Sequence, residues 1–580
     1  MNRFLTLASL LVLFVSCSEK KPKSLLNAAN SDLAIGTAKA SQLKTHSSDT
    51  FRLSLDSGAF VYGFVDQLTV DVKVDIYSPD RKKVGSFDNP SEGPEYYSFK
   101  TTKPGISTAV VTPFEESEGN YSMIVTRADK IATDPDARIA QIIASMGASN
   151  SVMPGYSVAV QKDGKILYSK GFGYANLEND IKITPSTVFH IASVSKQFTA
   201  FAIAILADQG KISLEDDIRK YLPELNDFGT TITINHLVHH TSGLRDQWSL
   251  LRMAGWRMDD VITRNQIMRL ISRQKELNFK PGDEYVYCNT GFTLMAEIVS
   301  RVGGEPFPEW MKKNIFVPLE MKSTLFYDDH EKIVNNRAYS YYQDANIIWK
   351  KSVLNYANVG ATSLFTTVED LSLWAANFDK IKVGNDHVMR TMNQRFILNN
   401  GDTIPYAFGQ VLGNYKGLPT AGHGGADAGY RTSIVRFPEQ HFSVSVFSND
   451  ASSSPGLLAY ELADIFLIKD FKTEKEKDTP GVSNPSPKEK FDGAGVKLTE
   501  FKGTYYSPEL ETRYTLVVLS DTLTAQHQRH DDIKLVPTAT NTFSGNIFGQ
   551  VEFTRNQKTN EVVGFKASNG RVRNLGFVKE

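Results

Sequence analysis

Ser193-Val194-Ser195-Lys196 is the stretch that decides the fold, and it stands just ahead of an apolar run from Phe198 to Ala207. The run is apolar almost all round, which predicts a helix buried inside a large core. Because residues three apart share one face of a helix, the side chains of Ser193 and Lys196 can touch. A serine hydroxyl becomes a good nucleophile when a neighbour takes its proton, and a nearby ammonium favours the deprotonated form of the groups around it. Taken alone, however, the tetrad is better explained by a Ser193 that is only the N-cap of the helix.

Two further motifs follow the tetrad along the chain. Tyr-Cys-Asn stands at 287–289, and Gly-His-Gly-Gly at 422–425 precedes an expected strand, Ser433–Phe437. Together, S-x-x-K, Y-x-N and H-G-G in this order resemble the serine β-lactamase and penicillin-binding-protein superfamily, in its class C-like branch. That branch contains D-Ala-D-Ala carboxypeptidases, D-amino-acid peptidases and β-lactamase-like esterases.

The resemblance extends beyond the three motifs. The stretch 236–244, His-Leu-Val-His-His-Thr-Ser-Gly-Leu, and the stretch 360–374 also look like segments of this superfamily, and the similar region spans roughly residues 136–468. It implies an α/β catalytic domain with a mainly antiparallel sheet covered by helices, plus an all-helical lobe. The active site is then expected between the two, with Ser193 at the start of a central helix.

The resemblance also implies the roles of the catalytic residues. Ser193 would be the acylated nucleophile, Tyr287 and Lys196 the proton-transfer pair, and Asn289 a hydrogen-bond partner of the substrate amide or of the lysine. An isolated tyrosine has a pKa near 10, so a basic Tyr287 requires a strong positive field, for which Lys196 is the obvious source. No metal or organic cofactor is implied.

The third motif would bind the substrate. The resemblance implies that His423, Gly424 and Gly425 contact it, and that the backbone N–H groups of Ser193 and Ala426 form the oxyanion hole. Glycines also let a substrate lie close to the strand. Many β-lactamases have K-T-G where this chain has H-G-G, and an imidazole holds a carboxylate less firmly than an ammonium does. Efficient penicillin hydrolysis is therefore doubtful, whereas peptidase and esterase relatives share H-x-G.

Three competing interpretations rest on other residues. Cys288, inside Y-x-N, is expected in the core, with a catalytic thiol as the alternative. His236, His239 and His240 suggest a metal site, but no H-E-x-x-H pattern or carboxylate cluster accompanies them, so packing is the preferred role. The stretch 155–159 is not a G-x-S-x-G elbow because it ends in Ala, which disfavours an α/β-hydrolase.

Charge and cysteine content exclude several classes of protein. The 64 Lys+Arg residues balance 65 Asp+Glu residues, so a nucleic-acid binder held by the phosphate backbone is disfavoured. Hydrophobic residues make up 41% and charged residues 22%, as in folded proteins. Cys17 and Cys288 are too few for a disulfide framework or a thiolate metal site.

The first residues predict a location in the bacterial cell envelope. Arg3 precedes an apolar run, residues 4–15, that is too short to span a bilayer but suits a signal peptide. Val-Ser-Cys at 15–17 resembles a lipobox, although Phe14 stands where Leu is usual. A lipoprotein anchored to a membrane through Cys17, facing the periplasm or the cell surface, is therefore predicted, with an ordinary secretory signal as the alternative.

Strand patterns and turn residues divide the rest of the chain. Short alternating strands before and after the hydrolase region predict flanking β-domains. The predicted parts are a signal peptide (1–16), a polar tether (17–48), a jelly-roll-like β-sandwich (49–128), the hydrolase domain (136–468), a charged linker (469–497) and a small β-barrel-like domain (498–580). The linkers suggest that each flanking domain folds independently.

The sequence therefore predicts a multidomain serine hydrolase that forms and hydrolyses an acyl-enzyme at Ser193. D-amino-acid peptides or small esters are the expected substrates. A β-lactamase is one alternative, and an inactive envelope-binding or scaffold lipoprotein is another from a different class.

Overall fold

A computed structural model describes residues 31–88, 93–114, 117–146, 152–344, 348–472, 491, 493 and 495–580. The predicted signal peptide, Cys17, the first part of the tether and most of the charged linker lie outside these described residues. The chain divides into two compact units, Met1–Thr133 and Asp134–Glu580. Within the described ranges, no helix is long and apolar enough to cross a bilayer.

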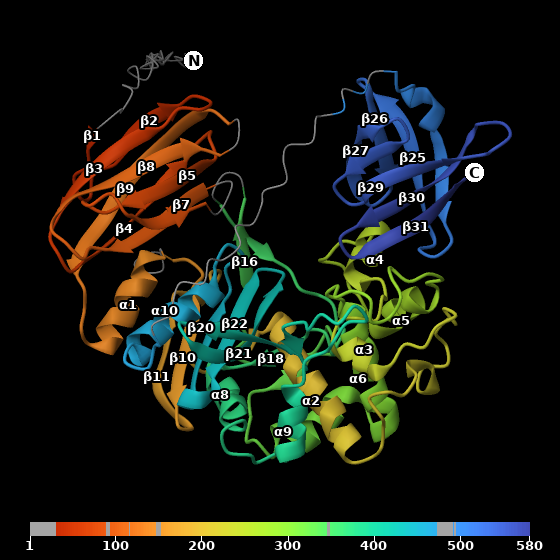
Figure 1. Ribbon diagram of the computed structural model, residues 1–580, viewed down its shortest axis with the longest axis horizontal. Helices are drawn as coiled ribbons and strands as arrows, with labels where there is room; N and C mark the ends of the chain where they lie inside the picture. Colours follow the sequence, from red (N-terminus) through yellow and green to blue (C-terminus); the bar gives the residue numbers. More distant parts are fainter. Residues whose placement is uncertain are drawn as a thin grey trace, which may run out of the picture. The chain divides into compact units, whose positions relative to one another are not determined.

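Two sheets form the first unit, a β-sandwich as predicted (Figure 1). One sheet has the order β1 (Ser31–Asp32), β3 (Asp49–Leu55), β8 (Gly105–Pro113), β5 (Val72–Tyr77), β6 (Lys83–Phe87), and the other β2 (Lys39–Leu43), β9 (Gly119–Lys130), β4 (Ala59–Gln67), β7 (Gly93–Lys100). The expected alternation along β3 is confirmed, since Phe51, Leu53 and Leu55 are all buried.

The sandwich begins earlier than the sequence predicted. Strands β1 and β2 lie within residues 17–48, which were expected to be a tether. Leu33 and Leu43 are buried in the core of the sandwich, and their burial ties this polar segment to the two sheets. The prediction of a tether is therefore wrong for the part of it that the structure describes.

A seven-stranded sheet with antiparallel neighbours organises the second unit. Its order is β11 (Lys165–Phe172), β10 (Tyr156–Lys162), β23 (Phe442–Ser448), β22 (Tyr430–Phe437), β21 (Leu418–Asp427), β20 (Gln410–Tyr415) and β19 (Tyr406–Ala407). Strands β10 and β11 form a hairpin that turns at Asp163 and Gly164, both with positive φ.

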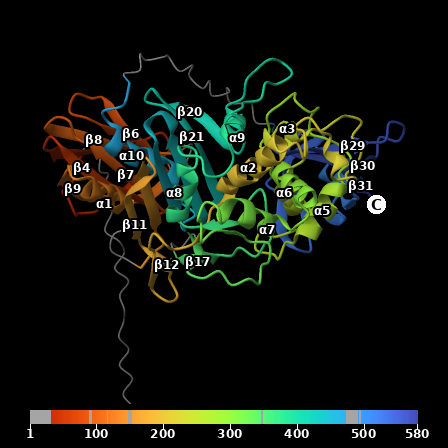
Figure 2. The same ribbon diagram turned by 90° about the horizontal axis from the view of Figure 1, so that it is seen from below.

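Helices cover both faces of this sheet (Figure 2). Helices α1 (Pro135–Ser145) and α10 (Pro455–Leu467) lie on one side, and α8 (Val368–Ala376) and α2 (Ser195–Asp208) lie on the other. The predicted helical lobe consists of α3 (Ile234–Val238), α4 (Gln247–Met253), α5 (Arg264–Ser272), α6 (Asn289–Gly303), α7 (Phe307–Met311) and α9 (Asp386–Met392). The predicted fold class of the catalytic domain is thereby confirmed.

Short elements connect these layers. The strands are β12 (Tyr174–Asn176), β13 (Ile181–Lys182), β14 (Phe189–His190), β15 (Leu325–Phe326), β16 (Ser340–Gln343), β17 (Trp349–Ser352) and β18 (Leu364–Thr366). The short helical turns are η1 (Ala192–Val194), η2 (Ile218–Lys220), η3 (Lys312–Phe316), η4 (Pro438–Gln440) and η5 (Leu498–Phe501).

Helix α2 is the buried helix that the apolar run predicts. Every residue from Ser195 to Leu206 is buried, and Phe198 stacks on Trp374 with ring centroids 4.2 Å apart. Contacts on all sides fix the axis of the helix. The turn η1, which carries Ser193, continues directly into it, so the position of Ser193 is fixed by the core.

The chain ends in a closed eight-stranded barrel, as predicted in outline. Its strands are β24 (Gly503–Ser507), β25 (Thr512–Leu519), β26 (Thr522–His527), β27 (His530–Ala539), β28 (Thr542–Gly545), β29 (Gly549–Arg555), β30 (Val562–Asn569) and β31 (Val572–Lys579). Pairing of β31 with β24 closes it. Buried aromatic rings such as Phe553, Phe565 and Phe577 pack together inside, with the last two stacked at 4.5 Å.

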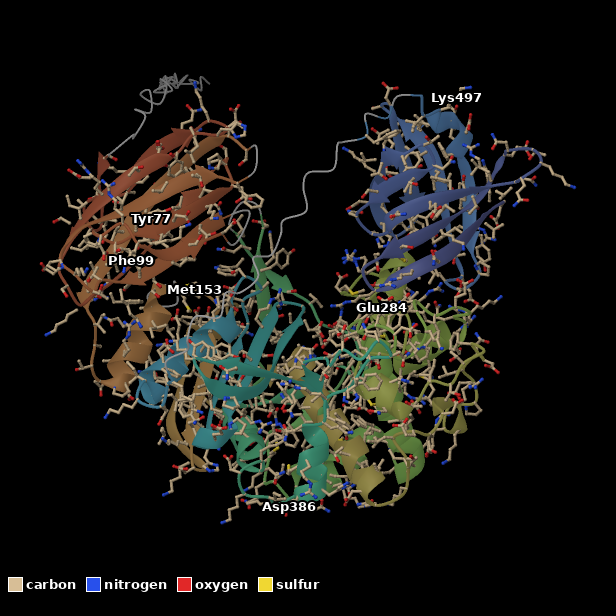
Figure 3. The ribbon with its side chains drawn as sticks, viewed as in Figure 1. Tyr77, Phe99, Met153, Glu284, Asp386 and Lys497 are labelled. Carbon is tan, nitrogen blue, oxygen red and sulfur yellow. The ribbon has the colours of Figure 1, made fainter. Side chains whose placement is uncertain are left out.

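The barrel docks on the helical lobe within the same compact unit. Arg245 of the hydrolase domain has a fully buried side chain that donates to Glu509 Oε2 (2.9 Å) and to the carbonyl of Arg573 (2.8 Å) in the barrel. Arg573 in turn pairs with Glu284 (2.8 Å), which Figure 3 labels where the two parts meet. The linker suggested that the C-terminal domain is an independent module. The barrel instead packs against the hydrolase domain through a charged, partly buried interface.

Removing the charge of Glu509 should destabilise the full-length chain. Glu509→Gln leaves the buried Arg245 guanidinium without its closest carboxylate, and breaking a buried pair typically costs about 3 kcal/mol or more. Glu580 pairs with the exposed Arg513 inside the barrel, away from the interface, and provides the control. Glu580→Gln should cost less than about 1 kcal/mol. Urea denaturation measures both, and equal effects would contradict a docked barrel.

Candidate active site

Ser193 stands on a strained turn at the start of α2. The residue before it, Ala192, has φ +48°, a left-handed conformation that costs a non-glycine residue roughly 1–2 kcal/mol. The buried Ser195 hydroxyl stabilises the turn, because it donates to Ala192 O (2.5 Å) and accepts from Leu364 N (3.2 Å). Ser195 is thus a structural residue of the tetrad, and the half-buried Ser193 hydroxyl remains available to a substrate.

Lys196 holds the centre of the site. Its buried amine donates to Ser193 Oγ (3.0 Å), to Asn289 Oδ1 (2.9 Å) and to Ala361 O (2.6 Å). Burial lowers the pKa of Lys196 to about 7, although the negative charge of Asp246 acts against this shift. A large fraction of the amine is therefore neutral near neutral pH and can accept the proton of Ser193.

Tyr287 lies beside this pair, but its environment differs from the expected one. The Lys196 amine faces the Tyr287 ring, 4.9 Å from its centroid. The buried Tyr287 hydroxyl has no partner of ordinary hydrogen-bond geometry among the described residues, although the Ser193 side chain is close enough to affect it. Burial raises the pKa of Tyr287, which opposes the expected role of this hydroxyl as a base; its place in a proton-transfer pair with Lys196 stays a prediction. In this geometry Lys196 is the better base.

A buried carboxylate that the sequence analysis missed orients Asn289. Asp246 Oδ2 accepts from Asn289 N (2.7 Å) and from Asn289 Nδ2 (2.8 Å), while Asp246 Oδ1 caps helix α4. These bonds turn Asn289 Oδ1 toward Lys196. Asp246 is the N-cap of α4 and stands two residues after the 236–244 stretch. This N-cap position is the sequence signal that could have identified Asp246.

His423 is placed beside the cavity as a neutral group. Its Nδ1 lies 2.5 Å from Gly424 O, and its Nε2 lies 3.1 Å from the hydroxyl of Tyr406. Burial and the charge of Lys196 lower the pKa of His423 to about 4. At neutral pH both ring nitrogens therefore have partners within the protein, and the side chain brings no positive charge to a substrate.

The two glycines after His423 serve different purposes. A Cβ atom on Gly425 would lie only 2.4 Å from the carbonyl oxygen of Ile191, so Gly425 lets strand β21 approach the turn that carries Ser193. Gly424 is exposed, and a Cβ atom on it would make only an ordinary contact with the Thr432 carbonyl oxygen at 3.8 Å, so Gly424 is the glycine that a substrate can approach. The backbone N–H groups of Ser193 and Ala426 as oxyanion donors stay a prediction.

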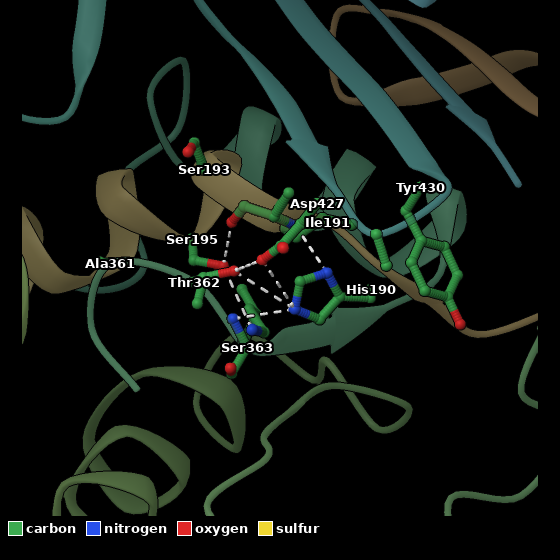
Figure 4. Close-up of polar contacts among 12 residues, drawn as sticks. His190, Ile191, Ser193, Ser195, Ala361, Thr362, Ser363, Asp427 and Tyr430 are labelled. Atoms are coloured by element: carbon green, nitrogen blue, oxygen red, sulfur yellow. Dashed lines mark hydrogen bonds and ion pairs between the residues drawn. The ribbon is translucent and has the colours of Figure 1, made fainter. Parts of the chain in front are cut away.

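A second network supports the turn from the other side (Figure 4). Thr362 Oγ1 donates to Asp427 Oδ2 (2.6 Å), and His190 Nε2 lies 3.9 Å from the same oxygen. Ala192 N donates to His190 Nδ1 (3.3 Å). Burial raises the pKa of Asp427 to about 7 and lowers that of His190 to about 3. No motif in the sequence pointed to this network.

The competing site residues have structural roles. Cys288 is buried, its thiol donates to Leu244 O (3.3 Å), and burial raises its pKa to about 12, which opposes a catalytic thiolate. His236 completes a capping box with Thr233, His239 bonds two backbone carbonyls, and His240 Nδ1 bonds Cys288. These contacts agree with the packing interpretation of the three histidines.

A cavity of about 820 Å³ opens over Ser193. Its walls include the predicted site residues Ser193, Tyr287, Asn289, His423, Gly424, Gly425 and Ala426. Lys196 lies buried next to Ser193. The structure therefore brings together all the predicted residues of the hydrolase domain, whereas Cys17 lies outside the described residues. The walls also include Arg571, a barrel residue that no sequence signal placed here.

An antiparallel sheet with a helical lobe, and a serine–lysine pair at the start of a buried helix, define the class of protein. A family profile described as Beta-lactamase matches residues 136–465. The chain belongs to the β-lactamase family, within the superfamily of penicillin-binding proteins that the three motifs predicted.

Relatives and solved structures agree with this assignment. The chain is 29% identical over 310 residues to a D-aminopeptidase of Gluconobacter oxydans (strain 621H), with 53% of this chain and 58% of the relative covered. It is 28% identical over 312 residues to Protein flp of Staphylococcus aureus (strain MW2), with 51% and 60% covered. The chain thus spans less than two thirds of the length of these relatives. The octameric penicillin-binding protein homologue from Pyrococcus abyssi shares the fold, with a TM-score of 0.51, 23% identity, and 77% of this chain and 99% of that chain covered.

The rate of acylation should rise with pH around neutrality. Only neutral Lys196 can accept the Ser193 proton, and with a pKa of about 7 its neutral fraction rises about tenfold from pH 6 to pH 8. Rates of fluorophosphonate labelling measure this profile. In Tyr287→Phe the midpoint should stay near the wild-type value, because the raised pKa of Tyr287 disfavours its hydroxyl as the base. A midpoint that disappears in this variant would assign the base to Tyr287 instead.

Asp246→Asn should change the pH profile as well as the rate. The variant keeps the size and the helix cap but removes the charge that raises the pKa of Lys196, so the midpoint should move to lower pH. Loss of the charged hydrogen bonds to Asn289 should slow acylation by roughly 10-fold or more. Asp217→Asn, at the N-cap of η2, is the matched control and should leave the profile unchanged. An unmoved midpoint in Asp246→Asn would reduce Asp246 to a structural role.

Proposed function

We propose that this protein is a serine hydrolase that acts as a penicillin-binding-protein-like peptidase or esterase. The observation that carries the proposal is the Lys196 amine, which lies 3.0 Å from Ser193 Oγ with a pKa of about 7. A base at hydrogen-bond distance from a hydroxyl, beside a cavity, is the arrangement that nucleophilic catalysis requires.

The reaction would proceed in two steps. Ser193 Oγ attacks the carbonyl carbon of the substrate, and its proton passes to Lys196 as the bond to the leaving group breaks. The leaving amine or alcohol takes a proton, and Ser193 is left as an ester. Water then attacks that ester, which releases the acid and restores the hydroxyl. Donors at the developing oxyanion, for which Ser193 N and Ala426 N are the proposed pair, are typically worth ~10²–10³ in rate.

D-amino-acid peptides and small esters are the proposed substrates. The similarity to a protein named D-aminopeptidase supports the peptide class, although the chain covers only 58% of that relative. A neutral His423 makes an efficient β-lactamase the weaker alternative. The inactive scaffold lipoprotein is disfavoured because Ser193, Lys196 and Asn289 form an unbroken hydrogen-bonded chain.

The proposed location is the bacterial cell envelope. The support is the sequence before Cys17 alone, namely the short apolar run and the lipobox-like Val-Ser-Cys at 15–17. In this proposal Cys17 carries a lipid that holds the protein on a membrane, with the hydrolase facing the periplasm or the outside of the cell.

Labelling with a fluorophosphonate tests the proposed activity. Intact-mass analysis should show one adduct on the full-length protein, and the adduct should be absent in Ser193→Ala. Ser352→Ala, which removes another serine of the cavity wall, is the matched control and should still react. A panel of D-Ala-D-Ala peptides, D-aminoacyl amides, p-nitrophenyl esters and nitrocefin then identifies the leaving group. An adduct that persists in Ser193→Ala would overturn the assignment of the nucleophile.

A further inference from the structure

The turn between β30 and β31 of the barrel reaches the catalytic cavity. Arg571, in this turn, lines the cavity together with Ser193 and His423. Its guanidinium carbon lies 5.2 Å from the centre of the Tyr287 ring. A residue of the C-terminal barrel is therefore part of the wall that faces the nucleophile.

Hydrogen bonds fix the main chain of this turn against the hydrolase domain. Arg571 O accepts from Asp246 N (3.2 Å) and from Asn278 Nδ2 (3.0 Å) in the hydrolase domain. Asn569 Oδ1 accepts from the N–H groups of Arg571 and Val572, both at 3.0 Å. The backbone thus holds the guanidinium at the cavity, where it contacts the Tyr287 ring by a cation–π interaction.

Arg571 differs from the other basic residues of the cavity wall. Lys351 is paired with Glu178 (2.8 Å), and Arg431 donates to the carbonyls of Ala428 and Tyr430. By contrast, the Arg571 guanidinium forms no hydrogen bond or ion pair with any residue that the structure describes. It is a cation whose hydrogen-bonding capacity is left for a ligand.

The acidic residues of the wall do not offset this charge. Asp259 is paired with Arg257, and Asp427 accepts a hydrogen bond from Thr362 and has a raised pKa. His423, which stands where many relatives have the lysine of K-T-G, is neutral and has partners on both ring nitrogens. The unpaired positive charge of the cavity therefore comes from the barrel and not from the third motif.

We propose that Arg571 is the carboxylate-binding residue of this enzyme and selects peptides that end in a free carboxylate. A guanidinium presents two parallel N–H groups that match the two oxygens of a carboxylate. This inference rests on the proposed peptidase function and names its substrate class, an acyl-D-amino-acid peptide with a free C-terminus. A peptide whose C-terminus is an amide lacks the charge that Arg571 would bind.

Two peptides that differ in one group test the proposal, an acyl-D-Ala-D-Ala and its C-terminal amide. For the wild-type protein, kcat/KM should favour the free acid by about 10- to 100-fold, as a charge-assisted hydrogen bond implies. Arg571→Gln should reduce this ratio to near one, and Arg571→Lys should retain part of it; the ratio is the readout because the Arg571 charge also acts on Lys196, equally for both peptides. Arg513→Gln removes an exposed barrel cation that pairs with Glu580, and should leave the ratio unchanged.

Binding measurements separate this proposal from the proposed activity. In Ser193→Ala, calorimetry should show tighter binding of the acid than of the amide, and the added Arg571→Gln change should remove the difference. If the wild type hydrolyses neither peptide but this binding difference is found, the peptidase function fails while the role of Arg571 stands. If both peptides are hydrolysed at similar rates, or if the preference survives in Arg571→Gln and Arg571→Lys, the role of Arg571 is overturned.

Discussion

Burial of the Lys196 amine is the constraint on which the rest of the active site depends. A lysine inside a protein core is costly unless its protons have acceptors, and it responds to burial by a lowered pKa. Asn289 and Ala361 supply acceptors next to Ser193, and Asp246 supplies a nearby negative charge. The remaining shift leaves the amine close to half neutral at neutral pH. Burial of Lys196 therefore lowers its pKa into the range that the proposed base requires.

The C-terminal barrel contributes to the active site although it has a hydrophobic core of its own. Aromatic rings fill the barrel, and its outer turns, rather than its interior, meet the hydrolase domain. The Arg571 carbonyl accepts from the backbone of Asp246, which orients Asn289, which in turn contacts Lys196. A short chain of hydrogen bonds thus links the docking of the barrel to the geometry of the nucleophile. Docking and catalysis are expected to respond together when this interface is disturbed.

The sequence predicted what depends on local pattern. The apolar run at 198–207 predicted the buried helix, alternation predicted strands of the flanking β-domains such as β3, and the three motifs predicted that Ser193, Lys196 and Asn289 share one site. It did not predict Arg571, because the partners of this residue are distant in the chain and no periodicity records such pairs. Asp246 was missed although it stands at a local N-cap position, because its contact with Asn289 is long-range. The raised pKa of Tyr287 was also missed, since burial of a hydroxyl is a property of the assembled cavity. Strands β1 and β2 were missed because their segment is mostly polar, and the isolated Leu33 and Leu43 give no strand pattern.

The histidine at position 423 of the third motif and the unpaired Arg571 of the barrel are best understood together. Replacing an ammonium by a neutral imidazole at His423 removes a positive charge from the wall near the nucleophile, and a site for anionic substrates must recover that charge elsewhere. In the proposed role, Arg571 supplies this charge from the barrel, with its guanidinium 5.2 Å from the centre of the Tyr287 ring. A cation on a barrel turn can be moved or exchanged without disturbing strand β21, where Gly425 must pack against Ile191. Substrate preference in this architecture can therefore change through the barrel while the serine–lysine pair stays the same.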